Sequence, residues 1–317
     1  MKILFTSVGR RVELVQAFHG AASRLREDVT LIGADITDTA PALYFCDRKV
    51  MVPRIRDEGY IPFLRRYCAE EHVDCLIPTI DTDLLLLAES RPTFEEVGTK
   101  VLISDRDKVS LCRDKNYTAD YFISLGLKSP RPVHRTTDYH GPWPAFIKPK
   151  DGSSSINAFK VESERDLRLH AEKIANYVIQ PFIEGTEYTM DIFCDYEGHP
   201  VFITPRQRIA VRSGEVLKTK IIQDETMIEE MKTLIADFRP RGQITVQLIR
   251  QKDTGVDYYI EINPRFGGGA PESMKAGADS AEAVIRMLRG EKLAFQPYAA
   301  EDGAVYSRFD QSIRVDE

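Results

Sequence analysis

The stretch ITVQLIRQKDTGVDYYIEINPRFGGG, residues 244–269, decides the fold of this chain. Its Asp-Thr-Gly turn, centred on Thr254, separates two runs rich in β-branched and aromatic residues, which predicts an antiparallel hairpin. In that register Gln247 lies opposite Glu261, and Asn263 follows two residues further along the second strand. Because side chains two residues apart share one face of a strand, these three polar side chains should point the same way.

The other face of the same hairpin is apolar. In the predicted register Val246 meets Ile262, and Leu248 meets Ile260. A polar face backed by an apolar one is typical of a strand pair that covers a core with one side. The apolar face should therefore pack inward.

The polar face has two interpretations. Carboxylate and amide oxygens are the ligands that Mg²⁺ prefers, so the three side chains could hold a magnesium ion. Alternatively, they could simply face solvent, as polar residues do on many half-buried strands. Arg265 and the glycines at 267–269 favour a ligand site, because glycine lets the backbone approach a ligand closely.

A second motif lies earlier in the chain. Residues 144–149 predict a strand that carries Lys148, and a loop of small residues follows it. Backbone N–H groups of such a loop can bind phosphate, and the lysine adds a positive charge. The residues of this loop are Gly152, Ser153, Ser154 and Ser155. The GxxxxGK[ST] order of a Walker loop is absent, and an ordinary surface loop is the alternative.

Together these motifs resemble those of ATP-grasp enzymes, most closely the carbamoyl phosphate synthase large-chain type. In that family a glutamine on one strand and a Glu-x-Asn-x-Arg motif on the next hold magnesium and phosphates. Gln247, Glu261, Asn263 and Arg265 match this pattern at the family's spacing. The resemblance implies ATP and Mg²⁺ as cofactors, with Mn²⁺ as an alternative ion. It also implies Gln247, Glu261 and Asn263 as the metal ligands.

The resemblance further implies how the nucleotide is held. Lys148 would reach the phosphates, and the loop at 152–155 would close over them. Lys115, which precedes a helix-ending glycine, matches the family's other phosphate-contacting lysine, and Lys108 is a competing candidate.

The run at 178–188 resembles the hinge that holds adenine in ATP-grasp proteins. By that match Gln180 and Ile183 would contact adenine, and Glu187 would accept hydrogen bonds from the ribose hydroxyls. Relatives often carry glutamate where this chain has Gln180, which leaves the exact adenine hydrogen bonds open.

Three arginines are the candidates for contact with the transferred phosphoryl group. Arginine suits carboxylates and phosphates because its planar fork binds two oxygens at once. Arg206 and Arg208 lie two residues apart on a strand-like run, and Arg265 follows the metal motif. For the first two, a solvated basic edge strand is the alternative.

Two carboxylates follow the strand predicted at 73–78. Asp81 and Asp83 lie at the strand end where open α/β sheets bind ligands, so they could hold an amine substrate. The preferred alternative is that Asp81 caps the helix that follows.

The 317 residues suffice for two domains. Strands alternating with helices over residues 1–105 predict a Rossmann-like parallel sheet, the α/β domain that precedes the ATP-grasp fold in this superfamily. Residues 106–317 predict an α+β, ATP-grasp nucleotide-binding and catalytic region. The expected strands are at 2–6, 29–34, 73–78, 101–103, 145–148, 177–181, 187–195, 201–204, 243–250 and 256–263, and the expected helices at 10–25, 60–71 and 108–125.

Composition limits the partners. A net charge of −6 and a pI of about 5.7 imply no general attraction to nucleic acid or to an anionic membrane. No apolar stretch reaches membrane-spanning length. The five cysteines form no CxxC pair, and the start of the sequence does not resemble a signal peptide, so a cytoplasmic location is expected.

The predicted activity is ATP-dependent ligation of a carboxylate to an amine, or to a thiol, through an acyl phosphate, with release of ADP and phosphate. Two alternatives stay open: a carbamoyl-phosphate-synthase-like phosphotransferase, and a non-catalytic ATP-binding regulatory protein. A nicotinamide oxidoreductase is disfavoured because the loop after the first strand has Gly9 alone of the GxGxxG pattern. The expected partners are small-molecule substrates, and a homodimer is left open.

Overall fold

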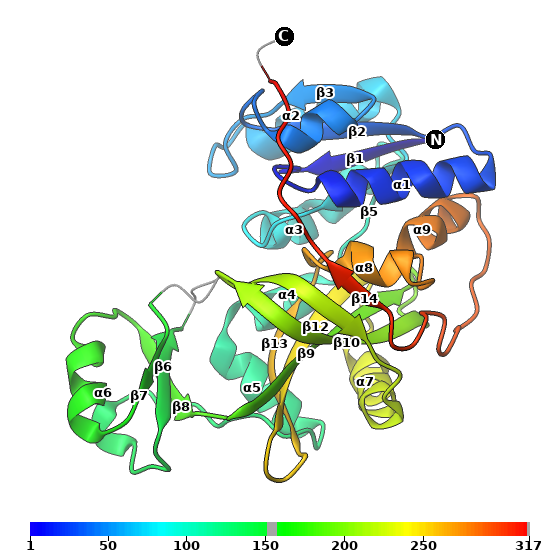
Figure 1. Cartoon of the computed structure of the whole chain (residues 1–317). Helices are drawn as coiled ribbons and strands as arrows, with labels where there is room; N and C mark the ends of the chain where they lie inside the picture. Colours follow the sequence, from blue (N-terminus) through cyan, green and yellow to red (C-terminus); the bar gives the residue numbers. More distant parts are fainter. Residues whose placement is uncertain (151–156, 316–317) are drawn as a thin grey trace.

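The computed structural model describes residues 1–150 and 157–315. They form a parallel sheet flanked by helices, a large antiparallel sheet and a small antiparallel lobe (Figure 1). Within these residues, no helix combines the length and apolarity that a bilayer crossing requires.

The first sheet is parallel, with strand order β3-β2-β1-β4-β5. Its strands are β1 (Lys2–Thr6), β2 (Thr30–Asp35), β3 (Arg48–Met51), β4 (Cys75–Pro78) and β5 (Lys100–Val101). The connections contain α1 (Val12–Leu25), η1 (Pro41–Phe45), α2 (Tyr60–Glu71) and α3 (Leu84–Glu95). The alternation predicted for this region is confirmed. Its central strands are almost fully buried because helices cover both faces of the sheet.

The connection out of this sheet differs from the prediction. The sequence predicts one helix over 108–125, whereas the structure has α4 (Arg106–Arg113) and α5 (Lys115–Ser124). Between them Asp114 is extended (φ −111°, ψ 114°), and its side chain accepts a hydrogen bond from the Asn116 backbone N–H at 2.9 Å. The single-helix prediction is wrong because aspartate competes with the helical hydrogen bonds and caps a new helix.

The small lobe is a three-stranded antiparallel sheet with order β7-β6-β8. Its elements are η2 (Thr136–Asp138), β6 (Ala145–Pro149), β7 (Phe159–Val161), α6 (Glu164–Ala171) and β8 (Tyr177–Pro181). It has its own core, in which Ile147, Val161 and Leu167 are fully buried.

The large antiparallel sheet has the order β13-β12-β9-β10-β11-β14. Its strands are β9 (Gly185–Cys194), β10 (Pro200–Arg212), β11 (Glu215–Ile221), β12 (Gly242–Gln251), β13 (Asp257–Asn263) and β14 (Val305–Ser307). Helix α7 (Glu225–Phe238) contributes Met227, Met231 and Leu234 to the core behind this sheet.

The register of the β12–β13 hairpin is confirmed over its first half. Val246 pairs with Ile262 and Gln247 with Glu261, as the turn position predicts. Beyond Gln247 a bulge shifts the pairing, so the predicted contact of Leu248 with Ile260 is wrong and Leu248 pairs with Tyr259. The extra residue lets the buried Tyr259 take the inward position.

The first sheet and the large sheet are joined by a shared core. Helices α8 (Ala270–Lys275) and α9 (Ser280–Leu288) pack on α1, and residues of all three belong to one apolar cluster. Phe18 links the two parts, with ring centroids 5.0 Å from Phe5 and 6.1 Å from Phe266. The predicted division at residue 105 falls between β5 and α4, and it stays a prediction.

Candidate functional site

The predicted metal ligands lie together on the face of the β12–β13 hairpin that is turned away from the core. Gln247, Glu261 and Asn263 are half-buried, and Asn263 Nδ2 donates to Glu261 Oε1 at 2.9 Å. Behind them, Val246 and Ile262 are buried in the core of the large sheet. The hairpin therefore presents a carboxylate and two amide groups on one accessible face.

Lys148 lies near this carboxylate, and Lys115 lies near Lys148. Lys148 is on β6, in the small lobe, and Lys115 is the first residue of α5. Burial lowers the pKa of Lys148 to about 8; the nearby charge of Glu261 opposes this shift and that of Lys115 adds to it. The competing candidate, Lys108, pairs instead with Asp237 at 3.2 Å.

The predicted phosphate-covering loop cannot be placed. Gly152, Ser153, Ser154 and Ser155 lie outside the described residues. The strand before it is placed, and Lys115 Nζ donates to the Lys150 carbonyl oxygen at 3.3 Å. Lys150 in turn pairs with Asp114 at 2.8 Å, so the base of the loop is tied to the start of α5.

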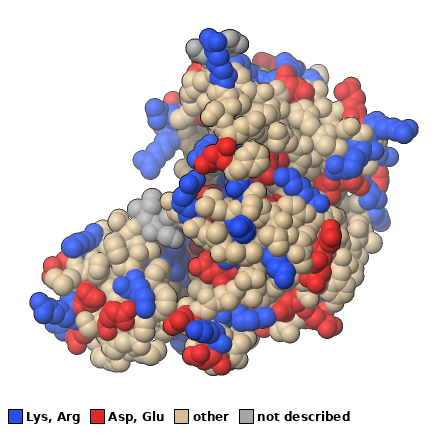
Figure 2. All heavy atoms as spheres, viewed as in Figure 1, with Lys and Arg blue, Asp and Glu red and all other residues tan. Residues whose placement is uncertain are grey.

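The predicted adenine and ribose residues lie where the small lobe meets the large sheet. Gln180 is buried, and its Nε2 donates to the Pro130 carbonyl oxygen at 2.6 Å. Ile183 is half-buried in the connection from β8 to β9, and Glu187 accepts from Arg208 Nε at 3.1 Å. Figure 2 shows the surface hollowed between the lobe that carries β6–β8 and the rest of the molecule.

The two arginines of β10 differ in their surroundings. Arg206 is 1% exposed, and its guanidinium group is held by Asp191 (2.7 and 3.3 Å) and the Thr219 hydroxyl oxygen (3.3 Å). The Arg208 side chain is 7% exposed and donates to Thr189 and to the exposed carboxylate of Glu187, the predicted ribose residue. Arg208 therefore borders the predicted nucleotide site, whereas Arg206 is enclosed within the sheet.

Arg265 reaches across to the first sheet. Its Nε and Nη2 atoms donate to the two carboxylate oxygens of Asp81 at 2.8 and 2.6 Å. The prediction that Asp81 caps the next helix is wrong, because no side chain caps α3. Asp81 instead orients the guanidinium group of Arg265 beside the triglycine run.

Arg11, which lies near Arg265, was not among the three candidate arginines of the sequence. Arg11 Nη2 donates to the Thr79 carbonyl oxygen at 3.2 Å. Burial, and then the neighbouring charge of Arg265, lowers the pKa of Arg11 to about 10. The sequence signal was weak, since Arg11 follows the first strand in a loop that lacks a recognised motif.

Asp83, the other carboxylate after β4, lies inside the first sheet's core. It is fully buried and accepts hydrogen bonds from Thr6 Oγ1 (2.9 Å) and the Tyr60 hydroxyl (3.0 Å). Burial raises the pKa of Asp83 to about 6. This placement disfavours the alternative in which Asp83 grips an amine.

Family models match most of the chain. Residues 112–269 match the ATP-grasp domain, and residues 3–102 match the PylC-like N-terminal domain. The chain therefore belongs to the ATP-grasp superfamily, with the parallel-sheet domain in front.

Individual relatives agree at low identity. The chain is 22% identical to the carbamoyl phosphate synthase large chain of Thermomicrobium roseum over 90% of its own length and 28% of that protein. It is 25% identical to D-alanine–D-alanine ligase B of Clostridium perfringens over 54% of its length and 63% of that protein. The chain thus spans less than two thirds of either relative.

A solved structure shows the same fold. The biotin carboxylase domain of 2-oxoglutarate carboxylase from Hydrogenobacter thermophilus, solved with MgADP and bicarbonate, matches with a TM-score of 0.75 at 15% identity. The match covers 96% of this chain and 73% of that one. The likeness extends over both the first sheet and the ATP-grasp region.

Proposed function

We propose that this ATP-grasp protein is an ADP-forming ligase that joins a carboxylate to an amine through an acyl phosphate. The observation that carries the proposal is the position of the buried Lys148, which lies close enough to Glu261 and to Lys115 to be affected by both charges, while Asn263 lies beside Glu261. The two lysines come from α5 and β6, and the carboxylate and amide oxygens come from the β12–β13 hairpin. Positive charges beside oxygen ligands are the groups that a metal-bound polyphosphate needs. The D-alanine–D-alanine ligase among the relatives supports the same reaction class.

The donor set fits a magnesium ion. Glu261, Asn263 and Gln247 offer carboxylate and amide oxygens on one face, the chemistry that Mg²⁺ and, as an alternative, Mn²⁺ accept. When bound, the ion would neutralise phosphate charge and so favour transfer of the terminal phosphoryl group. The hydrogen bond from Asn263 holds Glu261 ready for this role.

The nucleotide would lie between the small lobe and the large sheet. Lys148 and Lys115 would offset phosphate charge, and the loop Gly152, Ser153, Ser154 and Ser155 would supply backbone N–H groups. Gln180 and Ile183 would contact adenine. Glu187 would accept from the ribose hydroxyls, in exchange for part of its ion pair with Arg208.

The reaction would have two displacements. A carboxylate oxygen of the substrate attacks the γ-phosphorus of ATP and ADP leaves; the amine nitrogen then attacks the acyl carbon, phosphate leaves and the amine gives up a proton. Arg265, held by Asp81, and Arg208 would bind the oxygens whose charge develops during these steps. The protein supplies position and charge, so no protein nucleophile is required.

Nucleotide binding tests the first half of the proposal. A ligand that binds only the native state raises its apparent stability, so Mg-ATP should raise the melting temperature. Lys148→Ala should weaken that rise, Lys232→Ala, a half-buried lysine of α7 on the other side of the sheet, should not, and NADH should produce none. A rise with NADH but not with ATP would overturn the proposal.

Product analysis tests the second half. Pools of carboxylates and amines with Mg-ATP should release ADP and phosphate, which a non-catalytic regulatory protein would not do. With the active carboxylate labelled with oxygen-18, one label must appear in released phosphate if an acyl phosphate forms. A phosphotransferase would release a phosphorylated product without consuming an amine.

A further inference from the structure

The chain after α9 returns to the junction between the two sheets. Strand β14 pairs with the edge strand β11, and the following residues run along the first sheet until the Tyr44 hydroxyl donates to the Val315 carbonyl oxygen at 2.7 Å (Figure 1). Exposed ion pairs of Asp310 with Arg212 (3.3 Å) and Arg10 (3.8 Å) accompany it. This segment, residues 305–315, therefore spans the junction from the large sheet to the first sheet.

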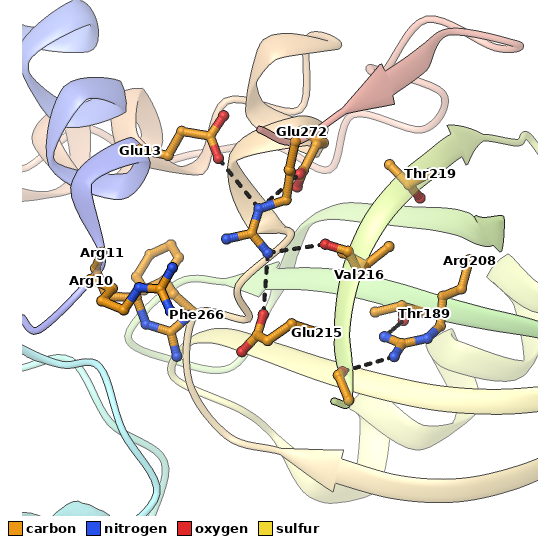
Figure 3. A network of polar contacts seen from close by, with 12 residues as sticks. Arg10, Arg11, Glu13, Thr189, Arg208, Glu215, Val216, Thr219, Phe266 and Glu272 are labelled. Atoms are coloured by element: carbon orange, nitrogen blue, oxygen red, sulfur yellow. Dashed lines mark hydrogen bonds and ion pairs between the residues drawn. The ribbon is translucent and has the colours of Figure 1, made fainter. Parts of the chain in front are cut away.

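One side chain of the segment enters a ring of carboxylates. Arg308 Nη1 lies 3.2 Å from Glu215 Oε2 and donates to the Val216 carbonyl oxygen at 3.1 Å. Its Nε lies 3.8 Å from both Glu13 and Glu272. Figure 3 shows the three glutamates converging on this guanidinium group from α1, β11 and α8. Glu13 also pairs with Lys275, and the buried Arg206 is a second positive charge near Glu272. Arg308 is thus a cation that all three glutamates share.

Glu272 makes this arrangement more than an acidic cluster. It is 1% exposed, yet neither of its carboxylate oxygens accepts a hydrogen bond from any residue that the structure describes. Burial raises the pKa of Glu272, and a buried carboxylate without donors carries a desolvation cost. Arg308 is close enough for an ion pair but not for a hydrogen bond. Both oxygens of Glu272 could therefore accept from a cation whose N–H donors are better placed than those of Arg308.

The pocket adjoins the proposed reaction centre. Gly268 lacks a side chain at the point where a Cβ atom would clash with Glu215 Oε2, so this carboxylate lies against the triglycine backbone. A Cβ atom there would also be 3.1 Å from Arg11 Nη1. Arg265 is three residues earlier in the same loop. A small molecule with one end at Arg265 could place its other end among the glutamates.

We propose that Glu13, Glu215 and Glu272 form a recognition site for a guanidinium or ammonium group of the substrate, and that Arg308 fills this site until the substrate displaces it. The proposal rests on the ligase function above and names a class for one of its substrates: a molecule with a cationic group remote from its reacting carboxylate or amine. The competing interpretation is that Arg308 only fastens the C-terminal segment.

Equilibrium binding tests the site without turnover. In Arg308→Ala, millimolar methylguanidinium should raise the melting temperature saturably, whereas methylurea, its neutral isostere, should not. Arg212→Ala is the matched control, because it removes an arginine that holds the same segment outside the pocket. Adding Glu272→Gln to Arg308→Ala should abolish the response. If Arg308→Ala does not fold, Arg308→Gln replaces it. A response to both probes, to neither, or equally in Arg212→Ala would overturn the site.

Substrate selectivity shows whether the glutamates bind a substrate cation or whether Arg308 only holds residues 305–315 in place. ADP release is measured for paired substrates that differ only in a guanidino or ureido end: 4-guanidinobutanoate against 4-ureidobutanoate with pooled amines, and agmatine against N-(4-aminobutyl)urea with pooled carboxylates. Removing the competing Arg308 should raise the guanidino-to-ureido ratio of kcat/KM at least about tenfold for one pair, a difference in binding of about 1.4 kcal/mol. Arg212→Ala should leave the ratio unchanged.

The outcomes are distinguishable from failure of the proposed function. A ratio that stays constant in Arg308→Ala, while turnover persists, shows that Arg308 only fastens the segment and overturns the inference. Absence of ADP release with every substrate pool in the wild-type protein contradicts the ligase function instead. In that case selective binding of methylguanidinium by Arg308→Ala still decides whether the cation site exists.

Discussion

The nucleotide side and the junction side of the proposed centre are built differently. On the nucleotide side, polar residues alternate along one hairpin, and Lys148 of the small lobe lies near Glu261. On the junction side, arginines are paired with carboxylates far away in the sequence, as Arg265 is with Asp81. Lysine acts as a movable point charge, whereas arginine fixes geometry through a planar fork. Substitutions on the nucleotide side should therefore lower catalysis with little loss of stability. Substitutions on the junction side should lower both.

The largest effect is expected at the β12–β13 hairpin, where a substitution should lower kcat without lowering the free energy of unfolding. Glu261→Ala should lower kcat for ADP formation by roughly 10³-fold, because a half-buried carboxylate with no core contact is removed from the phosphate site. Urea unfolding should show little loss of stability. Glu229→Ala, on the exposed face of α7, is the control. Wild-type turnover at saturating magnesium would contradict the role of Glu261.

The buried pair beneath the junction should behave in the opposite way. Arg206→Ala should lower the free energy of unfolding by about 3–5 kcal/mol, because Asp191 is left as an uncompensated buried charge. The exposed Arg212→Ala should change it by less than about 1 kcal/mol. Urea denaturation measures the free energy of unfolding of both variants. Equal losses would contradict the difference predicted between a buried and an exposed arginine.

Arg265 tests whether the junction arginines act in catalysis or only in stability. Arg265→Lys should lower kcat by roughly 10²-fold while ATP affinity changes little, since a point charge cannot replace the fork. Asp81→Asn should lower kcat less, because Arg265 remains but is held by fewer bonds. Melting temperature, ATP dissociation constant and kcat are measured on one preparation. A joint loss of stability and ATP affinity at unchanged kcat would make the pair purely structural.

The smallest expected effect is a pH dependence at Asp83. Its folded-state pKa of about 6 lies above that of the unfolded chain, so between about pH 4 and pH 6 the folded state binds more protons. Stability should thus fall as pH rises through this window, by on the order of 2 kcal/mol. Asp83→Asn should remove this part of the dependence. Parallel unfolding curves for the two proteins across pH 4–7 would show that Asp83 does not titrate there.

The difference between the hairpin and the junction also explains which features could be predicted from the sequence. Alternation and turn position suffice to place Gln247, Glu261 and Asn263 on one face, because a strand's period is local. They could not foresee the bulge that moves Ile260 out of register, since the choice depends on how Tyr259 packs against the helix behind the sheet. Burial of Arg206 was equally hidden, because α8, which covers that face, is remote in sequence from β10.

Contacts across the junction were beyond local patterns altogether. Arg11, Asp81 and Arg308 come from loops or edges whose neighbours are set by the packing of one sheet against another. Asp81 was considered only as an amine ligand or a helix cap, and the sequence around Arg11 and Arg308 contains no motif that points to these contacts. The break at Asp114 is different: an aspartate followed by helix-forming residues is a helix start, so this error was avoidable.

The core shared by α1, α8 and α9 has a consequence for how the protein is made. The ribosome synthesises β1 and α1 before the small lobe and strands β9–β13, so Phe18 can contact Phe266 and the apolar residues of α9 only after those parts have been made. Until then the nascent first domain presents an uncovered apolar stripe to the cell. Chains that terminate early should therefore be captured by chaperones or aggregate rather than persist as a folded amino-terminal fragment.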